Sequence, residues 1–173
     1  MVQLIRDMVR DVPDFPKPGI VFKDITTVIK DPKAFNTVID YFVDKLQDKK
    51  IDYIAAIESR GFIFAAPLAY RLNVGLIIIR KPGKLPAETE KMTYDLEYGT
   101  DTIEIHKDAI EKGASVVLID DLLATGGTAS AACKLINKVG GKLETAGFVI
   151  DLTFLNGKSK LPKDIEVITM VEY

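Results

Sequence analysis

The sequence of 173 residues contains one cysteine, one histidine and no tryptophan. Cys133 cannot form a disulfide within the chain, and a single thiol is typical of a reducing compartment. His106 alone cannot build a histidine-rich metal site, and no pair of cysteine or histidine residues has the spacing of a zinc site. These shortages exclude a disulfide framework and a dedicated metal centre of the zinc type.

Long apolar runs are also missing. The longest uncharged apolar stretch, residues 62–70, is far shorter than the roughly 20 residues that a membrane-spanning helix needs. Arg6, Asp7, Arg10 and Asp11 fall within the first turns and would interrupt the apolar core of a signal peptide. We therefore expect a cytoplasmic protein with no membrane contact.

The chain has no large excess of either charge, because 23 basic and 25 acidic side chains give a net charge of -2. A protein that wraps nucleic acid carries a strong positive excess, so we expect no nucleic-acid partner. Hydrophobic residues make up 47% of the chain, which excludes a disordered protein and is enough for a buried core. The length fits one domain, which we place over residues 1–173.

Short apolar runs alternate with segments of helical periodicity along most of the chain. This alternation predicts an open α/β fold, in which a mostly parallel twisted sheet carries helices on both faces around a Rossmann-like core. Asp31 followed by Pro32 marks a helix start, and Gly140 with Gly141 marks a helix end. The predicted helices cover residues 2–11, 32–48, 61–72 and 127–139, and the predicted strands cover residues 53–57, 76–79, 102–106, 115–119, 146–150 and 167–171.

Two segments lack any periodicity. Residues 13–19 contain three prolines and a glycine, which forbid a helix and predict a structured loop. Residues 82–99 contain two prolines and two glycines among many polar residues, and we interpret them as a long mobile loop. Loops of that length in compact domains are usually functional lids.

The most informative stretch, residues 116–129, reads VVLIDDLLATGGTA. A buried strand runs into Asp120 and Asp121, and a small turn rich in threonine and glycine then opens a helix. Free N–H groups at a helix start bind anions, and glycines let the backbone curl around a phosphate. The two carboxylates suit a sugar diol and can stabilise positive charge on a sugar ring. An N-cap beside a solvated acid is the plainer alternative for either aspartate alone.

This stretch resembles the signature for 5-phosphoribosyl 1-diphosphate (PRPP) in type I phosphoribosyltransferases, in the form that carries Leu122 and Leu123 after the acids. That form is typical of the adenine-specific members of the family. The resemblance implies that Asp120 and Asp121 hold the ribose 2- and 3-hydroxyls. It implies that the ribose 5-phosphate is cradled by Ala124, Thr125, Gly126, Gly127 and Thr128.

Residues 15–27, FPKPGIVFKDITT, are similar to the hood that covers the base in those enzymes. A rigid loop of this kind presents backbone donors and acceptors to a purine, and an aromatic ring can stack on it. The resemblance implies adenine contacts from the backbone near Val21 and Lys23 and stacking by Phe22. Taken alone, Phe22 would more simply be an ordinary loop anchor.

Two further segments supply charge around the predicted phosphate site. Ser59 and Arg60 follow a strand, where a guanidinium and turn amides can clamp a diphosphate, and the resemblance implies a strained peptide at Glu58–Ser59. The alternative for Arg60 is a plain surface arginine. In residues 80–99 a solvated face is the alternative to a functional role. The resemblance implies diphosphate contacts from Arg80, Lys81 and Lys84, an acid at Glu97 nearest the purine imidazole, and an adenine contact from Tyr98.

Taken together, these segments imply transfer of the 5-phosphoribosyl group from PRPP to adenine, giving AMP and diphosphate, a step of purine salvage. Residues 1–30 would form a helix and the base-binding hood, and residues 82–99 the lid. Mg²⁺ would arrive with PRPP without a ligand set of its own. The family also implies a homodimer, with Arg80 reaching toward the partner's site. Two alternatives stay open, namely a transferase for another purine and a nucleotide sensor without turnover.

Overall fold

A five-stranded parallel sheet forms the centre of the computed structural model, which describes residues 1–95 and 99–173. The strand order is β4-β3-β7-β8-β9. Apolar side chains occupy both sides of the inner strands, as expected of a parallel sheet covered on both faces. The predicted open parallel α/β fold is confirmed. The strands are β3 (Tyr53–Ile57), β4 (Gly75–Ile79), β7 (Ser115–Leu123), β8 (Lys142–Asp151) and β9 (Glu166–Glu172).

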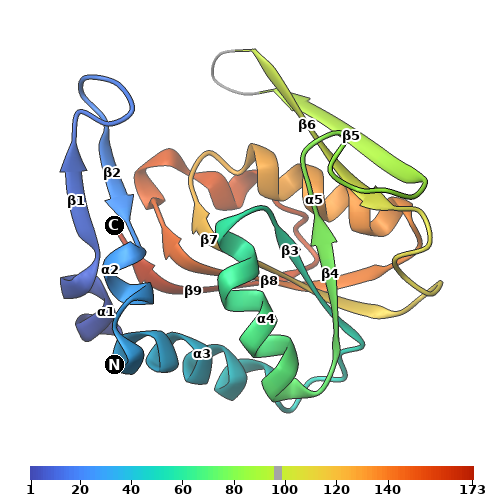
Figure 1. The fold of residues 1–173 in the computed structure, drawn as a ribbon, viewed down its shortest axis with the longest axis horizontal. Helices are drawn as coiled ribbons and strands as arrows, with labels where there is room; N and C mark the ends of the chain where they lie inside the picture. Colours follow the sequence, from blue (N-terminus) through green and yellow to red (C-terminus); the bar gives the residue numbers. More distant parts are fainter. Residues whose placement is uncertain (96–98) are drawn as a thin grey trace.

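Helices cover the two faces of the sheet unequally (Figure 1). One face carries α1 (Val2–Met8), α2 (Thr26–Ile29), α3 (Pro32–Leu46) and α4 (Arg60–Leu72). The other face carries α5 (Gly127–Lys138). The predicted cap is present, since the side chain of Asp31 accepts a hydrogen bond of 2.8 Å from the N–H of Ala34.

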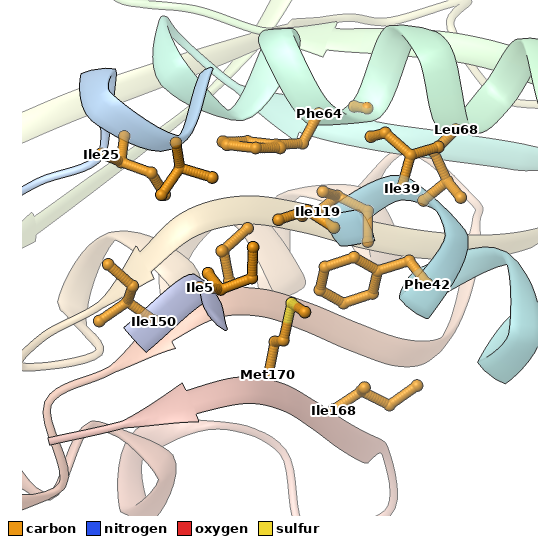
Figure 2. Packing of buried hydrophobic residues seen from close by; sticks show 14 of the residues in the cluster. Ile5, Ile25, Ile39, Phe42, Phe64, Leu68, Ile119, Ile150, Ile168 and Met170 are labelled. Carbon is orange, nitrogen blue, oxygen red and sulfur yellow. The ribbon is translucent and has the colours of Figure 1, made fainter. Parts of the chain in front are cut away.

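The larger apolar core lies between the sheet and the four-helix face (Figure 2). Phe42 from α3 and Phe64 from α4 are fully buried there, against Ile119 of β7 and Met170 of β9. The packing around Phe42 depends on a glycine in β8, since a Cβ at Gly147 would stand 2.9 Å from the phenylalanine ring. This core holds the central strands in place, and the candidate site lies at the ends of β3 and β7.

Within residues 82–99, predicted as one long loop from their composition, residues 89–95 form a strand. The strand β5 (Thr89–Asp95) pairs antiparallel with β6 (Thr100–His106), and this hairpin packs over α5 (Figure 1). Met92 and Tyr94 lie on its inner side against the smaller apolar cluster. The prediction was wrong because the alternation in β5 is short, and its partner strand and its apolar support come from elsewhere in the chain.

The N-terminal helix ends at Met8, not at residue 11 as predicted. Residues beyond it form β1 (Arg10–Pro13), which pairs antiparallel with β2 (Val21–Asp24). The side chain of Arg10 forms an ion pair with Asp24 across this hairpin. Strand pairing therefore outweighs the helical periodicity at the end of the segment. The structured loop predicted at residues 13–19 is confirmed as the connection between these two strands, except that Pro13 is the last residue of β1.

Two short 3-10 helices, η1 (Thr153–Leu155) and η2 (Gly157–Lys160), connect β8 to β9. No periodic pattern in residues 152–165 predicted these two short helices. The two ends of the chain lie close together, and the hydroxyl of Tyr173 donates a 3.0 Å hydrogen bond to the carbonyl of Arg6. Within residues 1–95 and 99–173, no helix combines the length and apolar character needed to cross a membrane.

Candidate functional site

A tight turn between β7 and α5 creates an anion site at the end of the sheet. Gly126 has φ +78 and precedes the first residue of α5, so the N–H groups of that first turn have no partner inside the helix. The helix then closes with a 2.9 Å hydrogen bond from the N–H of Ser130 to the carbonyl of Gly126. The left-handed backbone at Gly126 explains why glycine stands there.

A pocket of about 360 Å³ opens over this turn. It collects most of the residues that the sequence singled out for PRPP, together with Tyr94 and Asp101 from the hairpin. Its lining comes from the ends of β3 and β7, the starts of α4 and α5, and the β5–β6 hairpin. The lining residues are Ile57, Glu58, Ser59, Arg60, Lys81, Tyr94, Asp101, Asp120, Asp121, Leu122, Leu123, Ala124, Thr125, Gly126, Gly127, Thr128 and Ala129.

The two aspartates lie inside β7, because that strand continues to Leu123 and does not stop at residue 119 as predicted. Pairing with β8 extends the strand, with Asp120 opposite Phe148. Asp121 lines the pocket with 8% of its side chain exposed, and the Nε of Arg60 pairs with its carboxylate. The strand thus holds the two carboxylates in a rigid frame.

Asp120 sits in a confined place between β7 and α4. A Cβ at Gly61 would come within 2.8 Å of its Oδ1, so the helix approaches closely only because Gly61 has no side chain. Burial, and then the nearby carboxylate of Asp121, raise the pKa of Asp120 well above its usual range. A carboxyl in such a place gains most from a hydroxyl partner or a developing positive charge.

The hairpin adds a polar network that the sequence analysis missed. The hydroxyls of Tyr94 and Thr128 lie 3.1 Å apart, and the Tyr94 hydroxyl donates to Asp101 at 3.3 Å. Lys81 pairs with the same Asp101 carboxylate. Burial works to lower the pKa of Lys81, but the hydrogen bonds and charges of Asp101 and Tyr94 together outweigh it, and the net pKa is raised. Alternation around Tyr94 was the signal that could have revealed a strand facing the site.

Arg80 and Lys84 do not line the pocket, unlike the neighbouring Lys81. The Nε of Arg80 donates a 2.6 Å hydrogen bond to the carboxylate of Glu58, which itself lines the pocket. The peptide bond between Glu58 and Ser59 is cis. Of the cationic side chains predicted at the diphosphate, Arg60 and Lys81 therefore face the pocket in this structure, and Arg80 reaches it through Glu58.

The hood segment lies beside the pocket. Phe22 on β2 packs edge-on against Phe15, with ring centroids 5.3 Å apart, and the Cζ of Arg60 lies 5.6 Å from the centre of the Phe22 ring. This contact joins the hood to the pocket. Val21 is exposed on the same strand. The side chain of Lys23 turns away, forming an ion pair of 2.6 Å with Asp11 and leaving only its backbone for a base contact.

Glu97 and Tyr98, predicted beside the purine, lie outside the described residues. His106 and Cys133 do not line the pocket, and their contacts are those of structural residues. The Nε2 of His106 accepts a 3.3 Å hydrogen bond from the N–H of Ala87. Cys133 is buried in α5, and burial raises the pKa of its thiol to about 12, which leaves it unreactive as a nucleophile.

Residues 25–172 match the model of the phosphoribosyl transferase domain. A relative from Chloroflexus aurantiacus, named adenine phosphoribosyltransferase, is 55% identical over 171 residues, covering 99% of this chain and 98% of that protein. A crystal structure of adenine phosphoribosyltransferase from Thermoanaerobacter pseudethanolicus has a TM-score of 0.96 and 53% identity, covering both chains completely. The Saccharomyces cerevisiae enzyme, solved in a complex that includes adenine, has a TM-score of 0.92 and 42% identity, covering 98% of this chain and 97% of that one.

Proposed function

The chain belongs to the adenine phosphoribosyltransferases of the phosphoribosyl transferase family, pentosyltransferases of purine salvage, and we propose that the pocket over the β7–α5 turn is its active site. There the 5-phosphoribosyl group of PRPP passes to adenine, giving AMP and diphosphate. The observation that carries this assignment is the joining of three features in one pocket, namely the phosphate turn, the paired aspartates and the Ser59–Arg60 turn.

The 5-phosphate of PRPP binds the turn formed by residues 124–128. The unpaired N–H groups at the start of α5 and the helix dipole both favour an anion at this position. The hydroxyls of Thr125 and Thr128 add donors. Because these donors belong to a short turn, they bind the phosphate as a rigid unit.

The ribose lies over Asp120 and Asp121, whose carboxylates accept hydrogen bonds from its two hydroxyls. When the bond between C1 and the diphosphate oxygen breaks, positive charge develops on the ring. The paired carboxylates offset that charge, which is the chemical use of two acids held together. The electron pair of the broken bond leaves with the diphosphate.

The leaving diphosphate is held by Ser59, Arg60 and Lys81. Arg80 and Lys84 would also contact the diphosphate once the substrate is bound. When bound together with PRPP, Mg²⁺ would supply positive charge that offsets the charge of the diphosphate. The donor chemistry fits, since Mg²⁺ commonly binds substrate phosphates and water with few protein ligands. Residues 1–95 and 99–173 bring no three candidate metal-ligand side chains together, and an ion carried by the substrate needs no such group.

Adenine binds under the hood, with its ring against Phe22 and its edge at the backbone of Val21 and Lys23. A base nitrogen forms the new bond to C1. Glu97 manages the imidazole-side proton of the base, and Tyr98 contacts the ring. A carboxyl can do this once the closed site excludes water.

We also propose a homodimer. Leu76 and Ile78 of the edge strand β4 lie on the α4 side of the sheet and are exposed, and Ile63 and Tyr70 of α4 are exposed as well. Apolar side chains gathered at an open edge are typical of an interface. Arg80, at the end of that edge strand, would reach toward the partner's site. A cytoplasmic location is supported by the buried single thiol, Cys133.

The test is a product assay with PRPP, Mg²⁺ and each of adenine, hypoxanthine, guanine and xanthine in turn. Nucleotide formed from adenine alone is the expected result. Product from an oxopurine would contradict the assignment of the base while keeping that of PRPP. Absence of product with any base, together with intact PRPP binding, would favour a sensor over an enzyme.

A further inference from the structure

The backbone of Gly157, which does not line the pocket, packs directly against the phosphate turn, residues 124–128. A Cβ at Gly157 would stand 2.2 Å from the carbonyl oxygen of Ala124, and a Cβ at Gly126 would stand 2.3 Å from the carbonyl oxygen of Gly157. Two glycines therefore meet backbone to backbone. At this separation the position of Gly157 limits the positions open to the turn.

The next residue ties Gly157 to the sheet. The Nζ of Lys158 lies 2.8 Å from the carboxylate of Asp151 and 2.8 Å from that of Glu172. Asp151 ends β8 opposite Leu123, the last residue of β7 before the turn. Lys158 thus connects the ends of β8 and β9 to the segment that supports the phosphate turn.

Lys158 is the one charged partner that the structure shows for the buried carboxylate of Asp151 among the described residues. Asp151 is 1% exposed, and among the described residues its carboxylate oxygens have no hydrogen-bond donor apart from their ion pair with Lys158. A buried carboxylate is costly without a charged partner, so the pairing holds Lys158 in one place. Burial works to lower the pKa of Lys158, but its bonds to Asp151 and Glu172 outweigh this, and it stays charged.

We propose that Asp151, Gly157, Lys158 and Glu172 form a C-terminal brace that holds the phosphate turn in its anion-binding shape. Lys158 and Gly157 are then positioning residues for the 5-phosphate of PRPP, although neither lines the pocket. This inference rests on the proposed role of the turn in binding that phosphate. Groups that orient binding residues from behind change affinity about tenfold or more when lost.

The experiment measures the affinities of ribose 5-phosphate and of inorganic diphosphate by calorimetry, in wild type and in Lys158→Met. The brace predicts that Lys158→Met weakens ribose 5-phosphate by about tenfold and leaves diphosphate within about twofold, because diphosphate binds at the Ser59–Arg60 turn. Lys158→Arg should restore the affinity to within about threefold. Lys163→Met, which removes an exposed lysine and the same charge, is the matched control and should change neither affinity.

Two further variants keep the test available if Lys158→Met fails to fold. Asp151→Asn combined with Lys158→Met avoids the stranded carboxylate. Gly157→Ala acts on the turn without any change of charge. Both should also weaken ribose 5-phosphate selectively, and in steady state should raise the KM for PRPP with kcat within about twofold.

Equal weakening of both ligands, or a fall in the melting temperature with unchanged affinity for ribose 5-phosphate, would overturn the brace and leave a structural ion pair. The proposed function is tested by a different outcome. A wild type that binds ribose 5-phosphate but makes no AMP would contradict the proposed reaction and leave the brace untouched. A wild type that does not bind ribose 5-phosphate contradicts both.

Discussion

The Nε of Arg60 donates to the carboxylate of Asp121, joining the first residue of α4 to β7 across 61 positions of sequence. The same guanidinium lies 5.6 Å from the centre of the Phe22 ring. One side chain therefore contacts the acid pair, the hood and the space assigned to the diphosphate. Its planar fork suits this use better than a lysine would.

Replacing Arg60 with Gln should lower kcat/KM for PRPP by about 30-fold, which corresponds to roughly 2 kcal/mol, because the diphosphate loses a charged donor and Asp121 loses its partner. Lys at this position should recover only part of the loss. Steady-state kinetics with PRPP varied at saturating adenine measure the effect. Arg71→Gln is the control, since it removes an exposed pair with Asp40 from the same helix. Equal activity of the two Gln variants would contradict the role of Arg60.

Replacing Asp120 with Asn should stabilise the folded protein at neutral pH while impairing the reaction. The raised pKa means that the folded state binds the Asp120 proton more tightly than the unfolded state does. Wild type therefore loses stability, relative to the variant, as pH rises from about 4 through the raised pKa. Above that range the difference in stability between the two proteins stays constant, with the variant melting at the higher temperature.

Thermal melting of Asp120→Asn at several pH values checks this prediction. Well below the ordinary aspartate pKa of about 4 the two proteins should melt alike, because Asp120 is then protonated in both the folded and unfolded states. Asp48→Asn, on an exposed residue after α3, should show no such growing difference. If the variant were less stable than wild type at pH 8, the ionised Asp120 beside Asp121 would not be destabilising the folded protein, and the prediction would be wrong.

Gly126→Ala should weaken folding and PRPP binding together. The substitution strains a residue at φ +78 and places a Cβ 2.3 Å from the carbonyl oxygen of Gly157. Strain alone costs about 1 kcal/mol, and the overlap adds to it, so a total loss of about 2–4 kcal/mol is expected in denaturant unfolding. Gly113→Ala is the matched control, since its φ is +83 and nothing lies within 4 Å of the added Cβ. Equal losses in both variants would argue against a close approach at the turn.

Phe22→Ala should act on the base more than on PRPP. Loss of the ring removes a stacking partner worth about 1 to 1.5 kcal/mol, so the KM for adenine should rise by about tenfold. The KM for PRPP should change by less than about threefold, as measured with adenine saturating. Phe154→Ala removes an exposed aromatic side chain and serves as the control. A larger rise in the KM for PRPP than in the KM for adenine would contradict the assignment of the hood to the base.

Much of the parallel sheet could be predicted from the sequence because β3 and β7 are apolar runs, each followed by a helix of clear periodicity, α4 and α5. β3 has its predicted bounds, and Asp31 caps α3 as expected. Local signals of this kind need no information about distant residues.

Features that depend on distant partners were missed. The β5–β6 hairpin forms because Met92 and Tyr94 find apolar support on α5, which the sequence places far away. For the same reason Tyr94 and Asp101 did not appear among the candidate site residues. The contact of Gly157 with the phosphate turn is purely three-dimensional, because Gly157 lies about thirty positions further along the chain in a segment without periodicity.

The most direct test of the account is the turnover of the double variant Asp120→Asn with Asp121→Asn, measured with adenine, PRPP and Mg²⁺. The account predicts a fall in kcat of at least about a thousandfold, with ribose 5-phosphate still bound at the phosphate turn, because the two carboxylates offset the positive charge of the ring. Turnover close to that of wild type would contradict the proposed mechanism.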